Sequence, residues 1–408
     1  MNATDSAMPV SQTLPRERGL VLRNLADFQT ELARVAAGFV PGIAAWPVRI
    51  GWPREIFADF RMVQDLRTRH RELGVMPGEI HLSQAVPARA LIELLCAAPT
   101  PAAACAGIML HAKPRLAEWL EGLLREARGI YDLPSVPLLE ANIELLRRQA
   151  AWAREHLPAM CEINADFRAR LESALANLGA DLSRTDRRHA EQVRAGRRIG
   201  RLPLLDGVVP DGFAARATLP PKPSADSPYA ARERYYAFNF LQEVQAADSC
   251  GAILFEAPDM PWEFYFDTAR HMWDETRHSK FGELKLNALG LKVTDVTLST
   301  TAYRLRQTIA PHDRYAALTT QEADAFPGKH QGLKEALENH DSVGAMTWSY
   351  DIADETQHVR YGQKWLPTLI KAADDPRSPE QVRADAENWR AAVLLATYRP
   401  VEVAPASK

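Results

Sequence analysis

Two stretches of this chain are almost identical, DETRHSKFG at 274–282 and DETQHVRYG at 354–362. Each places a glutamate three residues before a histidine, and no other Glu-x-x-His sequence occurs in the chain. On a helix this spacing brings both side chains to one face, about one turn apart. The duplication therefore predicts a two-fold metal site inside a bundle of helices. The pairs are Glu275 with His278 and Glu355 with His358.

The spacing of apolar residues around the two blocks predicts four helical segments. They cover 229–256, 262–289, 303–338 and 341–371. Because proline has no amide hydrogen, we expect the third segment to be bent or broken at Pro311 and again at Pro327-Gly328. A last amphipathic helix is expected near 378–397.

Two further carboxylates follow from helix geometry. Dimetal sites in such bundles take one Glu from each of two helices and a Glu-x-x-His from each of the other two. In an antiparallel hairpin, residues at the same level lie equally far from the turn. Counting an equal number of residues on the other side of the turn leads from Glu275 back to Glu243. The same count from Glu355 ends on a stretch where Glu322 is the nearest glutamate. The separations of 32 and 33 residues agree, although nothing in the duplicated block requires this.

The predicted metal ligands are Glu243, Glu275, His278, Glu322, Glu355 and His358. Four carboxylates carry a charge of −4, which matches two divalent cations and offsets the cost of burying the acids. Mixed oxygen and nitrogen ligands suit iron or manganese better than zinc. We therefore expect two Fe ions, with Mn or a mixed Mn/Fe pair as alternatives. A break is expected in the helix soon after Glu322. Asp324 and Glu335 are therefore the alternative ligands on this segment if Glu322 does not bind the metal.

Four residues beside the ligands are candidates for supporting roles. Asp274 and Asp354 each precede a ligand glutamate, and we expect each to accept the Nδ1 proton of the opposite block's histidine. His271 and Asp351 lie four residues before the ligand glutamates, on the same helix face. Each is either an extra ligand, a proton-transfer group, or a buried polar residue bonded to its neighbours.

Three more residues lie close to the predicted site. Gly282 and Gly362 follow the ligand glutamates by seven residues, and we expect them to leave room beside the metals. Tyr361 is a candidate redox relay, but an aromatic side chain at helical spacing also suits a core position.

Composition favours an all-α fold with several domains in the 408 residues. The predicted division is a disordered tail at 1–18, an N-terminal helical domain at 19–182, an Arg-rich and Pro-rich linker at 183–228, the dimetal bundle at 229–371, and a C-terminal helix and tail at 372–408. The arginines of the linker either form a basic patch for an anionic partner or belong to a solvated linker.

The net charge and the cysteines indicate which partners and which cell compartment to expect. A net charge of −3 gives no reason to expect a nucleic acid or an anionic membrane as a partner. The four cysteines are scattered without a C-x-x-C, which suits a reducing cytosol. No secretory signal or transmembrane helix is predicted, and we expect a cytoplasmic protein.

At the duplicated blocks the chain resembles the ferritin-like di-iron carboxylate superfamily. D-E-T-R-H is similar to the D-E-x-R-H signature of its oxygen-activating members. The second block, followed by V-R-Y-G-Q-K-W-L, looks closer to an uncharacterised bacterial ferritin-like family, a domain of unknown function. The resemblance covers about 229–371 and implies a ferritin-like four-helix bundle with an additional N-terminal helical domain. That domain has no counterpart in ferritins or rubrerythrins.

The expected activity is that of a dinuclear non-haem iron oxidoreductase, an oxygenase or oxidase that uses O₂ to oxidise a small organic substrate. Electrons would come from another protein or a small molecule, and the oligomeric state stays open, a homodimer included. One alternative is a ferroxidase or peroxide-detoxifying protein without an organic substrate. Another is a metal-stabilised scaffold that binds a partner through the Arg-rich segment.

Overall fold

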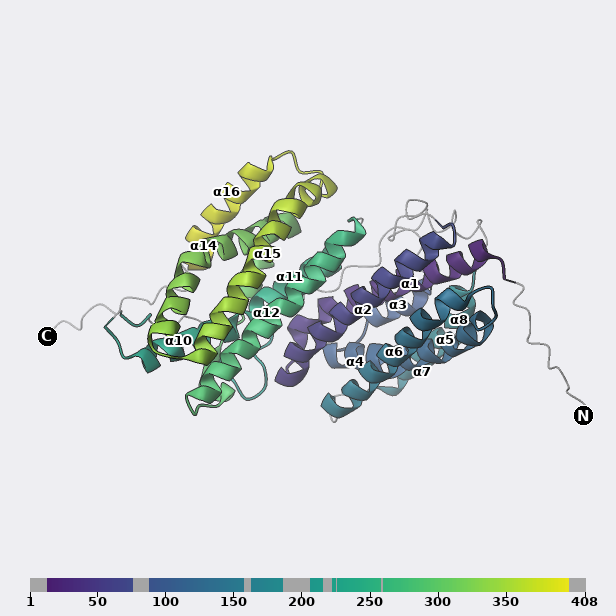
Figure 1. Cartoon of the computed structure of the whole chain (residues 1–408), viewed down its shortest axis with the longest axis horizontal. Coiled ribbons are helices and arrows are strands. Elements are labelled where there is room, and N and C mark those ends of the chain that lie inside the picture. Colours follow the sequence, from purple (N-terminus) through teal and green to yellow (C-terminus); the bar gives the residue numbers. More distant parts are fainter. Residues whose placement is uncertain are drawn as a thin grey trace, which may run out of the picture. The chain divides into compact units, whose positions relative to one another are not determined.

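The protein is described by a computed structural model that is almost entirely helical, as the all-α prediction requires (Figure 1). The described residues are 13–75, 88–157, 163–185, 206–215, 222–224, 226–257 and 260–395. The chain divides into two compact units. One comprises Met1–Phe39 and Glu55–Leu202, and the other comprises Val40–Arg54 and Pro203–Lys408. In the described ranges, no helix has the length and apolar character needed to cross a membrane.

The first unit is a set of helices with a mainly apolar core. Its elements, of which α2 begins in the other unit, are α1 (Pro15–Phe39), α2 (Trp46–Glu72), α3 (Arg89–Cys96), α4 (Pro101–Ala106), the π-helix η4 (Gly107–Ala112), α5 (Lys113–Ala127), η5 (Leu133–Ser135), α6 (Val136–His156), α7 (Ala165–Ala176) and α8 (Leu178–Leu182). Helix α1 includes residues 15–18 of the predicted tail, because Arg18 is buried and its Nε lies 3.1 Å from Asp132 Oδ2. A buried Lys113 ammonium contacts Asp59 and Gln149, each at 2.7 Å.

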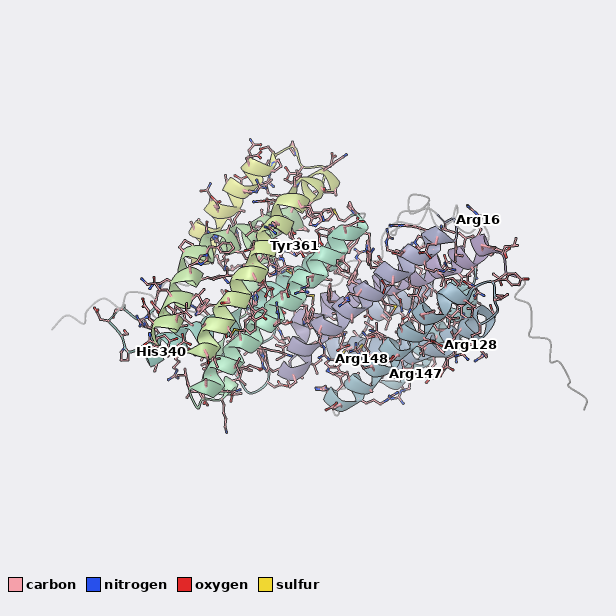
Figure 2. The ribbon with its side chains drawn as sticks, in the orientation of Figure 1. Arg16, Arg128, Arg147, Arg148, His340 and Tyr361 are labelled. Carbon is pink, nitrogen blue, oxygen red and sulfur yellow. The ribbon has the colours of Figure 1, made fainter. Side chains whose placement is uncertain are left out.

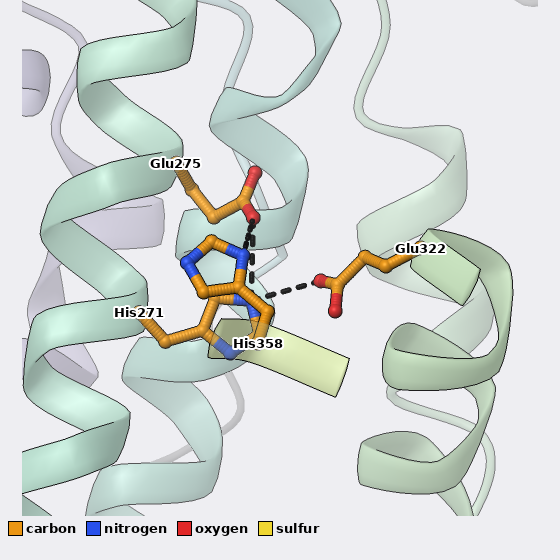
Figure 3. Close-up of side chains that lie close together, drawn as sticks. All are labelled: His271, Glu275, Glu322 and His358. Carbon is orange, nitrogen blue, oxygen red and sulfur yellow. Dashed lines mark hydrogen bonds and ion pairs between the residues drawn. The ribbon is translucent and has the colours of Figure 1, made fainter. Parts of the chain in front are cut away.

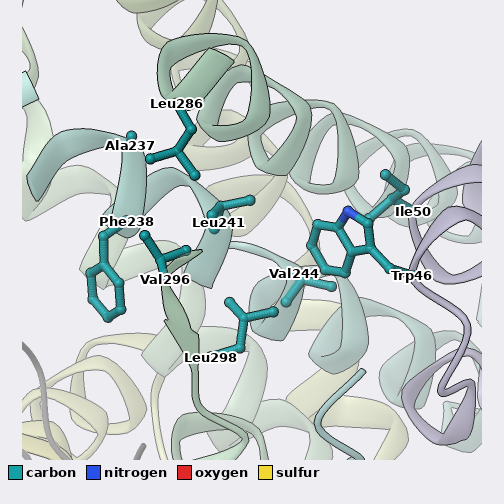
Figure 4. Packing of buried hydrophobic residues seen from close by; sticks show 9 residues of the cluster. All are labelled: Trp46, Ile50, Ala237, Phe238, Leu241, Val244, Leu286, Val296 and Leu298. Atoms are coloured by element: carbon teal, nitrogen blue, oxygen red, sulfur yellow. The ribbon is translucent and has the colours of Figure 1, made fainter. Parts of the chain in front are cut away.

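The short stretch Val40–Arg54, which includes η1 (Val40–Gly42), belongs to the second unit. The domain predicted at 19–182 includes this stretch. The structure assigns the stretch to the other unit for two reasons. Trp46 and Ile50 pack into an apolar cluster with Leu241, Val244 and their neighbours (Figure 4). The Arg49 guanidinium, 1% exposed, pairs with Asp248 at 2.5 Å. Burying these side chains fixes this stretch to the second unit.

The second unit contains four long helical segments. Its elements are β1 (Ala214–Ala215), α10 (Tyr229–Gln242), α11 (Val244–Glu256), α12 (Trp262–Ala288), η6 (Val293–Asp295), β2 (Thr297–Leu298), α13 (Thr301–Arg306), α14 (Pro311–Glu338), α15 (Ser342–Ala372), α16 (Pro379–Trp389) and the π-helix η7 (Arg390–Leu395). The segment α10–α11 packs on α12, and α14 packs on α15 (Figure 1). The two pairs meet where α12 contacts α15 and α11 contacts α14.

The third predicted segment is broken once, not twice. The chain leaves the helix after α13 and re-enters it at Pro311, where a proline suits the first helical position. Helix α14 then continues through Pro327. At Pro327-Gly328, where a bend or a break is expected, α14 is not interrupted, and both residues are exposed. Water can therefore bond the Ala323 carbonyl that proline leaves without an amide partner, while the opposite face of α14 stays packed on α15.

Several predicted segments lie wholly or partly outside the described residues. Of the Arg-rich segment only Arg184 is described, so the predicted linker at 183–228 is largely untested. The far C-terminal tail and residues 1–12 are also outside the described ranges.

The two short strands form a parallel pair, with Ala214 opposite Thr297.

Gly282 and Gly362 allow close helix contact rather than leaving room beside a metal. A Cβ placed on Gly282 would lie 2.7 Å from the Ala237 carbonyl oxygen and 2.9 Å from the Leu241 amide nitrogen of α10. On Gly362 it would lie 2.6 Å from Thr319 Cβ of α14. Backbone cannot yield to such a contact, so Gly282 fixes the separation of α10 and α12.

We predict that Gly282→Ala lowers the free energy of unfolding of the second unit by about 1–3 kcal/mol, since overpacking forces the two helices apart. The matched control is Gly328→Ala on α14, where a Cβ meets nothing within 4 Å. There alanine should raise stability by up to about 1 kcal/mol through its helix propensity. Urea unfolding followed by circular dichroism measures both. Equal effects of the two substitutions would contradict the packing role.

Candidate metal centre

Carboxylate and imidazole groups converge in two adjacent clusters inside the second unit. In each cluster, one ligand atom per residue lies within 4.8 Å of the others. The first cluster is His271, Glu275, Glu322 and His358, and the second is Glu243, His278, Asp351 and Glu355. All six predicted ligands are present, and His271 and Asp351 complete the two sets of four.

The first cluster is buried, and its four side chains come from three helices (Figure 3). His271 and Glu275 come from α12, Glu322 from α14 and His358 from α15. His271 Nε2 lies 2.8 Å from Glu322 Oε1 and 3.2 Å from Glu275 Oε1. The rings of His271 and His358 stack with centroids 3.8 Å apart. No side chain in this cluster is more than 7% exposed.

The second cluster is richer in oxygen and reaches solvent. His278 Nδ1 lies 3.1 Å from Glu243 Oε2 and 3.5 Å from Asp351 Oδ1. Asp351 and Glu355 are buried on α15, whereas the Glu243 side chain is 25% exposed. Glu243 stands between α10 and α11, where the helix is interrupted. The second cluster therefore opens toward water at Glu243.

Two glutamates face both clusters. Glu275 Oε1 lies 3.2 Å from His358 Nδ1 in the first cluster, and its Oε2 lies 3.7 Å from His278 Nδ1 in the second. Glu355 is placed in the same way, with Oε2 lying 3.6 Å from His358 Nδ1 and Oε1 turned to the second cluster. Each of these carboxylates therefore directs one oxygen to each cluster.

Several close contacts inside the clusters do not have the geometry of hydrogen bonds. Buried atoms such as Glu243 Oε2, Glu275 Oε1, His278 Nδ1 and His358 Nδ1 make no hydrogen bond of acceptable geometry, although neighbouring ligand atoms lie 3.1–3.2 Å away. Ligands held about 2.0–2.2 Å from one ion at right angles are about 3 Å apart. An unpaired buried polar atom is costly. The residues therefore fit two cations.

The aspartates of the two blocks hold the imidazoles of the opposite blocks. Asp354 Oδ2 lies 3.1 Å from His278 Nε2, and Asp274 Oδ2 lies 3.5 Å from His358 Nε2. The crossed pairing follows the prediction, but the nitrogen involved is Nε2, because Nδ1 faces the clusters. Arg277 donates to Asp274 at 3.0 Å and also pairs with Asp354, which ties the two aspartates together.

A buried lysine at the second cluster was not predicted. Lys329 Nζ lies 2.8 Å from Asp351 Oδ1, 2.8 Å from Glu355 Oε1 and 3.7 Å from Glu243 Oε1. It follows Glu322 by seven residues on α14, so it lies on the same helix face two turns away. Lys285 follows His278 with the same spacing, so the spacing alone does not single out Lys329.

Charges within the clusters shift the pKa values of several groups. Burial opposes ionisation of Glu355, yet the Lys329 charge and the neighbouring His358 hold its pKa at about 2. Burial likewise opposes ionisation of Asp274, but bonds from His358 and Arg270 hold its pKa at about 2. Burial alone would lower the pKa of Lys329, but the surrounding carboxylates raise it well above its ordinary value. Lys329 is thus a cation.

The remaining candidates lie outside the two clusters. Asp324 is exposed and pairs with Arg390, and Glu335 accepts a hydrogen bond from Tyr236, so neither replaces Glu322. Tyr361 lies beside the site on α15, with its ring 6.4 Å from that of His358 (Figure 2).

A comparison of the chain with protein-family models, curated proteins and solved structures gave no match.

We predict that the purified protein carries about two iron or manganese ions, and that the bridging ligand matters more than the others. Glu275→Ala should remove most of both ions, whereas Glu243→Ala and Glu322→Ala should each remove about one, since each contributes to a single cluster. Metal analysis by mass spectrometry measures this. The control is Glu335→Ala, a buried carboxylate of α14 outside the clusters. One zinc per chain, or full metal content in Glu275→Ala, would count against the site.

We predict that Asp354→Ala weakens metal binding by about 10–100-fold without removing a ligand, because it frees the His278 ring that Asp354 orients. Competition with a chelator of known affinity gives the change. Asp324→Ala, at an exposed surface ion pair, should leave the affinity unchanged. An equal loss in both variants would show that Asp354 acts only through general stability.

Proposed function

We propose that the four long segments at 229–371 form a ferritin-like four-helix bundle, joined to an additional N-terminal helical domain, and that the bundle holds a dinuclear iron centre that activates O₂. The observation that carries this is the pair of four-residue clusters sharing two carboxylates. The pairwise packing of α10–α11 with α12 and of α14 with α15 supports the bundle assignment.

Each residue of the proposed centre would have a distinct role. Glu275 and Glu355 would lie between the ions, with His271, Glu322 and His358 on one side and Glu243, His278 and Asp351 on the other. Two iron ions held by these residues would supply the redox equivalents for O₂ activation. Asp274 and Asp354 keep the imidazole rings oriented. Only the Glu243 edge is partly exposed, so a small organic substrate would approach there.

Mixed oxygen and nitrogen ligands favour iron or manganese. The first cluster offers two imidazoles and two carboxylates, and the second offers one imidazole and three carboxylates. This difference supports a mixed Mn/Fe pair as the alternative to two iron ions, because oxygen ligands suit manganese.

We predict that protein loaded with Fe(II) under argon consumes O₂ on mixing, and that uptake saturates at two Fe(II) per chain. Glu275→Ala should abolish this fast phase, and Glu335→Ala should retain it. An oxygen electrode and stopped-flow absorbance measure the reaction. Continued oxidation of Fe(II) added far beyond two equivalents would favour the ferroxidase alternative. No reaction in fully loaded protein would rule out O₂ activation.

A further inference from the structure

The two clusters are not equivalent, because only the second contains a fixed positive charge. Within the described part of the chain, no lysine or arginine forms an ion pair with His271, Glu275, Glu322 or His358. At the second cluster the Lys329 ammonium is 9% exposed and contacts three of the four members.

The ammonium contacts one carboxylate oxygen of Asp351 and one of Glu355, both members of this cluster. Asp351 Oδ1 is 2.8 Å from Lys329 Nζ and 3.5 Å from His278 Nδ1, so the same oxygen faces both groups. Glu355 Oε1 is also 2.8 Å from Lys329 Nζ, and the other oxygen of Glu355 is turned to the first cluster. A cation between Asp351, Glu355 and His278 would therefore have to displace the ammonium or lie against it.

The position related to Lys329 in the other helix pair is a cysteine. Lys329 follows Glu322 by seven residues, and Cys250 follows Glu243 by seven. Cys250 is fully buried on α11. The first cluster thus meets a thiol where the second meets a lysine ammonium.

We propose that Lys329 is a built-in competitor for the second metal position, so that the two ions bind in order. The first cluster fills at low metal concentration. The second fills only when an ion takes Asp351 Oδ1 and Glu355 Oε1 from the ammonium. This proposal rests on the dinuclear centre proposed above, and it makes the solvent-facing cluster the one that exchanges its ion.

A purely structural role for Lys329 leads to the opposite expectation. If the ammonium served to hold Asp351 and Glu355 in place for the metal, removing it would weaken the second binding step. If it competes, removing it leaves three carboxylates with no cation, and the second ion should bind more tightly. The sign of the change therefore distinguishes the two roles.

The test is a titration of the metal-free full-length protein with Mn(II), followed by calorimetry and by electron paramagnetic resonance. The wild-type protein should show one tight and one weaker step. The signal of isolated Mn(II) ions should change to that of a coupled pair only in the second step. In Lys329→Met the second step should tighten by about tenfold or more, and the first should change little.

Two further variants keep the result interpretable. Lys285→Met on α12 removes another buried lysine, which is 2% exposed and bonded to Glu233 at 2.6 Å, and it should leave both steps unchanged. Where Lys329→Met does not fold, Lys329→Gln removes the charge and keeps a hydrogen-bond donor. Two equal steps in the wild-type protein, or a second step that Lys329→Met weakens or leaves alone, would overturn the role of Lys329. Absence of any Mn(II) binding would instead contradict the dinuclear centre.

Discussion

Five carboxylates lie together in the interior of the second unit, and this concentration of negative charge dictates the chemistry around it. They are Glu243, Glu275, Glu322, Asp351 and Glu355. Two like charges 4 Å apart repel by about 4 kcal/mol at an effective dielectric constant of 20. The fold therefore needs cations at this place. Lys329 supplies one of them, since its Nζ lies within 3.7 Å of Glu243, Asp351 and Glu355.

The two helix pairs of the second unit each contribute side chains to both clusters. Each duplicated block gives its histidine to one cluster and its glutamate to both. Each block's aspartate then orients the histidine of the other block. Such an arrangement requires α12 and α15 to lie in direct contact, as they do. Gly282 sets the approach of α10 to α12, so the helix that leads to Glu243 lies close enough for its carboxylate to reach His278.

Sequence reasoning found the features that depend on helical periodicity. The ligand face of α12 and α15 follows from the Glu-x-x-His spacing, and Glu243 and Glu322 follow from the equal lengths of the hairpins. It could not find features set by tertiary surroundings. Whether Pro327 breaks a helix depends on which side of α14 faces water. The assignment of Trp46 to the second unit depends on an apolar cluster formed by residues nearly 200 positions later. Lys329 belongs to no sequence motif. Its role becomes visible only from the carboxylates that surround it in the folded chain.

The break between α10 and α11 makes Glu243 different from its counterpart Glu322. Glu322 lies inside the continuous helix α14, one turn after Thr319, and its carboxylate is buried against His271. Glu243 ends one helix and begins the next, with a quarter of its side chain exposed. A ligand on a helix interior is held by the backbone bonds on both sides, whereas one at an interruption has fewer such constraints. The enclosed first cluster is thus the rigid half of the centre. The second has an interrupted helix, a partly exposed carboxylate and a buried lysine, and these features support the proposal that ions and small molecules enter on this side.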